Sequence, residues 1–245
     1  NKIGSEFLVN RETDDFQGYS TVSALYGNQF LVTWDSFNQV SDDSDYDVYG
    51  HIFDILGNKI GHEMIINSHS EGEQGYSESA ALKNGMFVVT WESFNQRSDD
   101  SNYDVFARLF NTDGDRLSSE ITVNSFYKGT QGGAGITALN DGSFLIIWSS
   151  YDQAGDNSNY DVYGQFFDSE GNKIKSEFLI NSYIESTQGN YDGGNIIQLK
   201  NGNILIAWSS FEQDGSGYGV YGQLIDRGGT KLTDDFRINT FPYKD

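Results

Sequence analysis

Three polar segments of this sequence place carboxylate or amide oxygens on alternate residues. They contain Asp43, Asp45 and Asp47; Asp100, Asn102 and Asp104; and Asn157, Asn159 and Asp161. Hard cations such as Ca²⁺ favour oxygen ligands at such spacing, although the glycine and the bidentate glutamate of an EF-hand loop are missing here. The pattern therefore predicts either calcium sites or ordinary turns in which Asp and Asn bond their own backbone.

A second set of residues could bind a sugar. Four times an aromatic ring is followed two residues later by a glutamine: Phe37 and Gln39, Phe94 and Gln96, Tyr151 and Gln153, and Phe211 and Gln213. An aromatic face beside an amide can hold a carbohydrate, and several weak sites on one chain would add avidity. The alternative is that each ring packs inside the fold and each glutamine bonds a neighbouring loop.

Residues for acid–base or nucleophilic catalysis do not stand out. The three histidines (His51, His62 and His69) lie close together and are not repeated, cysteine is absent, and the carboxylates are spread along the chain. An active site needs a poised acid, base or nucleophile, so the sequence predicts a protein that is not an enzyme.

The composition narrows the range of partners. Thirty-six acidic residues against 15 Lys and Arg give a net charge of −21, which disfavours nucleic acid and anionic membranes. No apolar run approaches the 18 residues of a membrane-spanning helix, so no membrane insertion is expected. The acidic surface suits a secreted protein, for which the expected partners are copies of itself or a cell-surface glycan.

The elements that carry these residues repeat. The four tryptophans, Trp34, Trp91, Trp148 and Trp208, are 57, 57 and 60 residues apart, and each begins the pattern Trp-x-Ser-(Phe/Tyr)-x-Gln. After a polar loop comes Tyr-(Asp/Gly)-Val-(Tyr/Phe)-(Gly/Ala). A fixed period of this kind indicates one supersecondary unit used several times. Because apolar runs precede the tryptophans, we expect these rings to lie in the core.

The sequence of each unit predicts four antiparallel strands. A strand of small residues ends in a turn such as Asn84-Gly85, an apolar strand ends in the tryptophan, and an alternating strand leads to a polar edge strand. The sequence predicts an all-β, single-domain fold over residues 1–245, a four-bladed β-propeller with blades near 17–67, 74–124, 131–181 and 188–239. A β-sandwich is the alternative, but it has no reason to keep the period.

The fourth unit has a familiar form. Its segment Trp208-Ser209-Ser210-Phe211-Glu212-Gln213-Asp214-Gly215-Ser216-Gly217-Tyr218-Gly219-Val220-Tyr221-Gly222-Gln223 resembles a repeat of large secreted and surface-attached bacterial proteins. The resemblance extends over the whole chain and implies a propeller in an adhesin-type exoprotein. The first three units depart from it, since a longer acidic loop replaces Asp-Gly-Ser-Gly.

The edge-strand pattern occurs once too often. It appears five times, first in residues 1–10 with Phe7 and Val9, and last with Phe236 and Ile238. One copy is left over in four blades, so it belongs either to a longer array or to an assembly in which it pairs with a neighbouring molecule. The sequence therefore predicts an extracellular structural or adhesive protein, plausibly a filament subunit joined by strand donation. The alternatives are a lectin-like carbohydrate-binding propeller and a calcium-binding surface module.

Overall fold

The computed structural model describes residues 4–41, 44–98, 101–155, 158–189 and 194–240. Their strands form four antiparallel sheets of four strands, and within each sheet the strands lie in chain order. The all-β, four-bladed propeller architecture predicted from the repeat is confirmed. Blade 1 contains β1 (Gln17–Leu25), β2 (Gln29–Phe37), β3 (Tyr46–Asp54) and β4 (Lys59–Ile65); blade 2 contains β5 (Gln74–Ala81), β6 (Phe87–Phe94), β7 (Tyr103–Phe110) and β8 (Ile121–Thr122).

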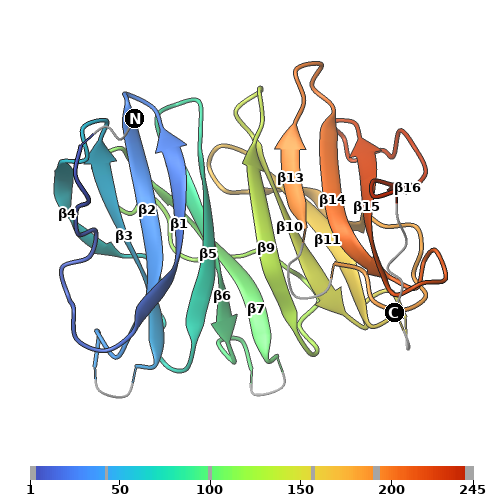
Figure 1. Cartoon of the computed structure of the whole chain (residues 1–245), viewed down its shortest axis with the longest axis horizontal. Coiled ribbons are helices and arrows are strands. Elements are labelled where there is room, and N and C mark those ends of the chain that lie inside the picture. Colours follow the sequence, from blue (N-terminus) through green and yellow to red (C-terminus); the bar gives the residue numbers. More distant parts are fainter. Residues whose placement is uncertain (1–3, 42–43, 99–100, 156–157, 190–193, 241–245) are drawn as a thin grey trace.

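The last two blades repeat this order. Blade 3 contains β9 (Gln131–Ala138), β10 (Phe144–Tyr151), β11 (Tyr160–Phe167) and β12 (Lys173–Leu179); blade 4 contains β13 (Asn195–Gln198), β14 (Ile204–Phe211), β15 (Tyr218–Ile225) and β16 (Phe236–Arg237). The inner strands β1, β5, β9 and β13 pack against one another in succession. The blades fan out from them, with blade 1 at one end of the molecule and blade 4 at the other (Figure 1).

The core lies between successive blades. On one side of each interface are aliphatic residues such as Leu31, Ile52 and Ile66 of blade 1, and they pack against the tryptophan face of the next blade. Trp91 and Trp148 are fully buried, and Trp34 and Trp208 are nearly so. The expectation that the tryptophans form the core is confirmed. In blades 2 and 3 the apolar runs before them are buried on both faces, because each of these blades is sandwiched between two neighbours.

In blades 1–3 a buried asparagine holds the end of the outer strand in place. In blade 2 the side chain of Asn124 accepts a hydrogen bond from the Val105 N–H (2.8 Å) and donates one to the Asp104 carboxylate (2.6 Å). Asn67 and Asn181 make the same bonds in blades 1 and 3. These bonds explain why the units share both Tyr-Asp-Val and a terminal Asn, since a buried polar group needs a partner.

The N-terminal copy of the edge-strand pattern has a definite place. Among the described residues the first strand begins at Gln17, so residues 4–10 form no strand ladder. Instead Phe7 lies against Phe53 of blade 1, with ring centroids 5.5 Å apart, and beside Gly57. The backbone N–H of Arg11 donates a hydrogen bond to Glu63 (2.8 Å). The N-terminal segment thus covers part of the tryptophan face of blade 1.

Candidate functional site

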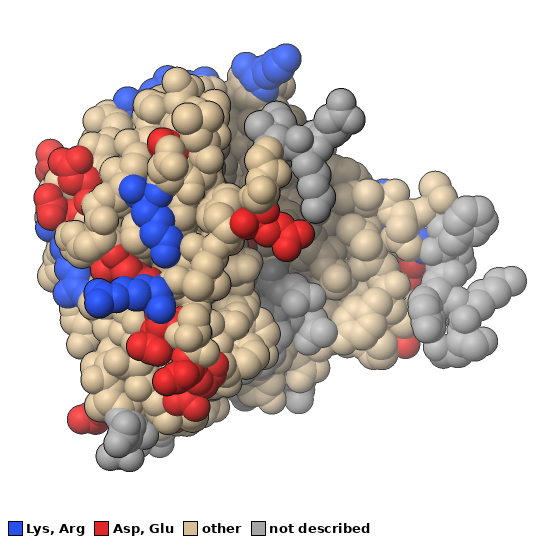
Figure 2. Space-filling model, turned by 60° about the vertical axis from the view of Figure 1, so that its left-hand side comes forward, with Lys and Arg blue, Asp and Glu red and all other residues tan. Residues whose placement is uncertain are grey.

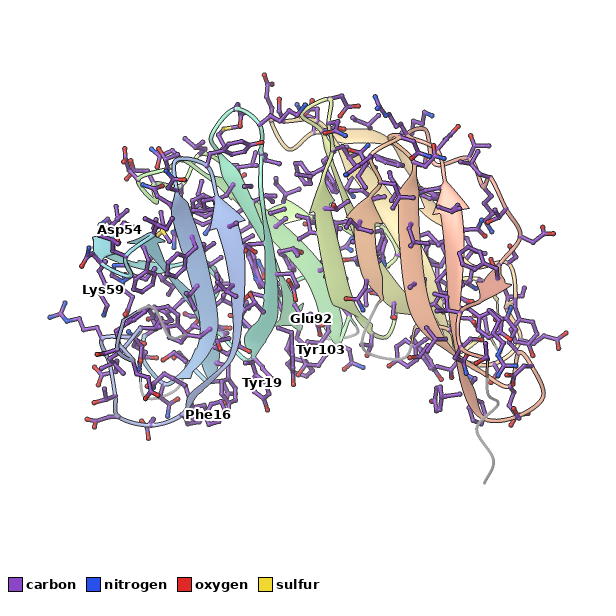
Figure 3. All side chains as sticks on the ribbon, turned by 45° about the horizontal axis from the view of Figure 1, so that its top comes forward. Phe16, Tyr19, Asp54, Lys59, Glu92 and Tyr103 are labelled. Carbon is purple, nitrogen blue, oxygen red and sulfur yellow. The ribbon has the colours of Figure 1, made fainter. Side chains whose placement is uncertain are left out.

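A cavity of about 510 Å³, which we call the axial cavity, opens along the inner strands of the first three blades. Its wall consists of β1, β5, β6 and β9 residues: Tyr19, Ser20, Thr21, Tyr76, Ser77, Glu78, Glu92, Gly133 and Ala134. Figure 3 shows Tyr19, Glu92 and Tyr103 at one end of the blades, on the same side as Phe16 and away from Asp54 and Lys59. The cavity therefore joins residues from three consecutive repeats.

Two tyrosines form an aromatic surface in this cavity. Tyr19 and Tyr76 are 56% and 44% exposed, and their ring centroids lie 5.3 Å apart. Both have a positive φ, 49° and 53°, at the bulge where the inner strand begins. Such a backbone is uncommon for a bulky residue and is maintained only where the surroundings enforce it. Here the bulge turns each ring out of the sheet, where it can contact a ligand.

Glu92 contributes a carboxylate to the cavity wall. It follows Trp91 on β6 and is only 1% exposed, yet it borders the cavity. One carboxylate oxygen accepts a hydrogen bond from the Gly133 N–H, and the other has no partner among the described residues. Burial, aided by the negative charges of Glu73 and Asp35, raises the pKa of Glu92 to about 8. The group is consequently protonated at neutral pH, as a general acid must be.

Asp35 occupies the same position one repeat earlier. It follows Trp34 on β2, is 2% exposed, and accepts a hydrogen bond from the Tyr76 N–H (3.0 Å). Burial raises its pKa to about 7, against the lowering effect of that hydrogen bond. This hydrogen bond holds the backbone of Tyr76, a residue of the cavity wall, in position. The negative charge of Asp35 also contributes to the raised pKa of Glu92.

Glycines make room for both carboxylates. A Cβ atom added at Gly75 would lie 2.5 Å from Asp35 Oδ2, and one added at Gly132 would lie 2.7 Å from Glu92 Oε2. These glycines belong to the Gln-Gly pair that recurs in the repeats. The pair is visible in the sequence, but the space that each carboxylate needs is visible only in the structure. In blades 3 and 4 the residue after the tryptophan is serine, Ser149 or Ser209, so only the first two repeats carry the acid.

Two further glutamates complete the acidic surroundings. Glu78, on β5, lines the cavity, and partial desolvation raises its pKa. Glu73 precedes the same strand and accepts a hydrogen bond from the Tyr103 hydroxyl. The site thus contains one buried carboxyl in Glu92 and one accessible carboxylate in Glu78. Two carboxyl groups with different environments can serve as acid and base.

The cavity continues toward blade 4. A second cavity of about 230 Å³ shares Glu78 and Ala134 with the first and extends to Asn195 and Ile196 on β13. Figure 2 shows the surface hollowed between a larger lobe on the left and a smaller lobe on the right. The two cavities together form a groove across the inner strands, lined by residues of all four blades.

The sugar-binding residues predicted from sequence lie elsewhere in each blade. Phe37, Phe94, Tyr151 and Phe211 each pack on the tyrosine that opens the next strand, with centroids 4.9–5.2 Å apart. Their glutamines join loop to edge strand: Gln39 bonds Glu63 (3.0 Å), Gln96 bonds Glu120 (2.6 Å) and Gln153 bonds Glu177 (2.7 Å), while Gln213 accepts from Ser210 (2.8 Å). Tyr151 is the most exposed of these rings, at 38%. None of the eight residues lines the axial cavity.

The predicted calcium ligands separate into three groups. Asp43, Asp100 and Asn157 lie outside the described residues. Asp45, Asn102 and Asn159 have exposed side chains and positive φ values of 50–56°, which is typical of turns. Asp47, Asp104 and Asp161 are buried and bonded to the asparagines described above. Within the described part of the chain, no group of three acidic or histidine side chains could hold a metal ion.

The residues predicted for an assembly strand are found at both ends of the fan. Phe7 and Val9 lie on blade 1, Val9 beside Trp34, whereas Phe236 belongs to β16 and Ile238 follows it. Phe236 and Ile238 are 36% and 47% exposed. The three histidines lie in blade 1 and its following loop, and His51 is buried beside Phe53, with its pKa lowered by burial.

Several solved structures have a similar fold. The α-L-arabinanase of Penicillium chrysogenum, complexed with arabinobiose, aligns over 91% of this chain and 66% of its own, with a TM-score of 0.58 and 14% identity. The endo-arabinase of Bacteroides thetaiotaomicron aligns over 87% and 76%, with a TM-score of 0.54 and 13% identity. A thermostable family-43 glycoside hydrolase aligns over 92% and 78%, with a TM-score of 0.56 and 9% identity. No family model matches the chain, and neither does any curated protein sequence.

These findings correct the function expected from sequence. The prediction of a structural or adhesive filament subunit without enzymatic activity depended on the apparent lack of a poised acid or base. Glu92 and Asp35 contradict that premise, and the chain has the fold of several glycoside hydrolases. At 14% identity or less the likeness establishes the fold, an all-β propeller. Within the described ranges no helix is long and apolar enough to cross a membrane.

Proposed function

We propose that the protein binds a carbohydrate in the axial cavity and hydrolyses a glycosidic bond there. The observation that carries this proposal is the position of Glu92: a buried carboxyl with its pKa raised to about 8, beside an exposed tyrosine pair. The fold shared with arabinan-degrading enzymes supports it. We also propose that the protein acts outside the cell, where polysaccharides are found and a strongly acidic surface remains soluble.

In this proposal the two cavity glutamates have separate roles. Hydrolysis of a glycoside needs a protonated carboxyl to donate to the leaving oxygen and an ionised carboxylate on the other side of the sugar. Glu92 is protonated at neutral pH and donates the proton. Glu78, whose side chain is exposed, takes the second role and activates water or attacks the sugar carbon. Asp35 acts indirectly, because its negative charge raises the pKa of Glu92 and so favours the protonated form.

The aromatic pair determines how the sugar is held. Sugar rings present C–H groups on their faces, and these pack on aromatic rings while hydroxyl groups bond nearby polar atoms. Tyr19 and Tyr76 supply such a face, and Ser20 and Ser77 also line the cavity. This surface also supports a second candidate function, a carbohydrate-binding propeller without hydrolysis, which would need the tyrosines but not the acid.

The two functions are distinguished by two variants and one control. The purified chain is incubated with arabinan and a panel of soluble polysaccharides, and both binding and new reducing ends are measured. Glu92→Gln is expected to lower turnover at least about 100-fold with little loss of binding, since a general acid contributes 10²–10⁴-fold. Tyr76→Ala is expected to weaken binding. Glu170→Gln, in an exposed hairpin of blade 3, serves as the matched control and should change neither.

The outcomes separate as follows. Binding by the unmodified chain that Tyr76→Ala weakens and Glu92→Gln leaves intact, without product from any of the chains, would assign the protein to the binding-only class. If the unmodified chain neither binds nor cleaves any polysaccharide, the cavity is not a carbohydrate site and the proposal is wrong. A loss of turnover in Glu170→Gln equal to that in Glu92→Gln would show that the loss is not specific to the cavity, and the role of Glu92 as the acid would then fail.

A further inference from the structure

The outer face of blade 4 contains apolar residues that are buried at the same positions of the other blades. The valine of the third strand is fully buried as Val48, Val105 and Val162, but Val220 is 42% exposed. The aliphatic residue before the terminal asparagine is fully buried as Ile66, Val123 and Ile180, but Ile238 is 47% exposed. Ile197 on β13 is also exposed, at 56%.

In blades 1–3 this face is always covered by the same structure. The tryptophan face of the next blade packs on it, as Trp91 and Phe106 pack on Ile66 and its neighbours. The contact includes a glycine of positive φ in the hairpin of the next blade: Met64 lies against Gly114, Ile121 against Gly171 and Phe178 against Gly229. The residue of blade 4 that corresponds to Met64, Ile121 and Phe178 is Phe236.

Polar bonds fix the register of these contacts. The residue after the terminal asparagine donates its backbone N–H to a carboxylate of the next blade: Ser68 to Glu120, Ser125 to Glu177 and Ser182 to Asp235, at 2.5–2.6 Å. A basic side chain of the next blade returns to a carbonyl near the asparagine, as Arg116 does to Asn67 and Lys231 to Asn181, both at 2.9 Å. Blade 4 ends in the same pattern, at Asn239 and Thr240.

The tryptophan face of blade 1 is covered by the N-terminal segment, so a fragment of a blade is enough to form this interface. Phe7 lies against Gly57 as Met64 lies against Gly114, and Arg11 bonds Glu63 as Ser68 bonds Glu120. Residues 5–11 thus take the position that the end of a preceding blade would have. The same interface is therefore formed four times among the described residues. The face that precedes the tryptophan face in each of these contacts stays exposed on blade 4, as far as the described residues extend.

We propose that this face of blade 4, formed by Ile197, Val220, Phe236 and Ile238, is an interface for a further unit of the same repeat. The occupant presents its tryptophan face, a hairpin glycine that receives Phe236, and a carboxylate that accepts the N–H of the residue after Asn239. This interface does not involve the axial cavity, so it is independent of the proposed glycosidase activity.

The test replaces residues 240–245 with such a unit. A copy of residues 68–125 is joined directly after Asn239, which preserves the spacing found between blades 1 and 2. In the extended chain we expect hydrogen exchange in β15 to slow at least about tenfold, and Val220→Asp to lower the melting temperature by about 5–10 °C. In the unextended chain the same substitution should leave the melting temperature unchanged within about 1 °C, because Val220 is exposed there.

A matched control and three contrary outcomes make the test decisive. Leu56→Asp, in an exposed hairpin of blade 1, should be neutral in both chains. An appended unit that remains unstructured, or that folds while Val220→Asp stays neutral, would overturn the proposal. Self-association of the unextended chain that Val220→Asp abolishes, measured by sedimentation, would instead assign the face to a second copy and also refute it.

Discussion

The carboxylate of Asp35 accepts a hydrogen bond from the backbone N–H of Tyr76, 3.0 Å away on the next blade. This bond connects an acid at the end of an apolar strand to a residue held in the left-handed conformation. It therefore couples the packing of blades 1 and 2 to the position of an aromatic ring in the cavity. Glu92 and Gly133 repeat the connection between blades 2 and 3.

The stability of the protein should decrease as the pH rises from about 4 to 8. The folded state raises the pKa of Asp35 from 3.8 to about 7 and that of Glu92 from 4.5 to about 8. Between these values the folded state binds more protons than the unfolded state, so the free energy of unfolding falls with pH, by up to about 1.4 kcal/mol per pH unit for each group. Thermal unfolding at several pH values measures this slope.

Glu92→Gln should flatten this pH profile, because an amide does not titrate. The exposed control Glu170→Gln should leave the slope unchanged. A melting temperature that rises between pH 5 and pH 8 in the unmodified protein would show that these carboxyls are ionised in the folded state, and the assignment of Glu92 as a general acid would then fail.

Gly75→Ala should destabilise the protein because of Asp35. The added Cβ would lie 2.5 Å from Asp35 Oδ2, which forces the carboxylate away from the Tyr76 N–H. Overpacking of this kind costs about 1–3 kcal/mol. In the Asp35→Ser background, which imitates Ser149 of blade 3, the same alanine should cost much less. A double-mutant cycle from urea unfolding measures the difference, and additive effects would contradict the steric explanation.

The repeat pattern was sufficient to predict most of the fold. Tryptophans at a fixed spacing, Asn-Gly turns and apolar runs gave the four sheets, because a periodic sequence of strands has few ways to bury both faces of its inner layers. The position of residues 4–10 could not be predicted. Their alternating pattern indicates a strand, but whether such a segment pairs or packs depends on a neighbouring face that only the structure reveals.

The candidate site was missed for a specific reason. Asp35 and Glu92 stand in the variable position of Trp-x-Ser, so the residues common to all repeats do not include them. A carboxylate in an otherwise apolar, doubly buried strand is itself a signal, since burial of an acid is costly without a function or a partner. The conspicuous Asp of Tyr-Asp-Val, by contrast, is bonded to asparagine in blades 1–3.

Trp91→Ala should cost about 3–5 kcal/mol of unfolding free energy. The ring is fully buried between blades 1 and 2, stacks on Phe106 at 6.2 Å and lies under the Arg108 guanidinium, so its removal leaves a large cavity. Urea unfolding measures the change. If stability were near that of the unmodified protein while carbohydrate binding was lost, Trp91 would be a binding residue rather than part of the core.

Asn124→Ala should destabilise the protein more than Asn239→Ala, although both residues occupy the same position of the repeat. Asn124 is buried and bonds both the Val105 N–H and the Asp104 carboxylate, so its removal leaves two buried polar groups without that partner. Unsatisfied groups of this kind cost about 1–3 kcal/mol each. Asn239 bonds the Val220 N–H (2.9 Å), but blade 4 has Gly219 where the other blades have the aspartate. Urea unfolding of both variants gives the comparison. Equal losses would mean that the bond to Asp104 adds no stability, and that this aspartate is instead available for another role, such as the predicted calcium site.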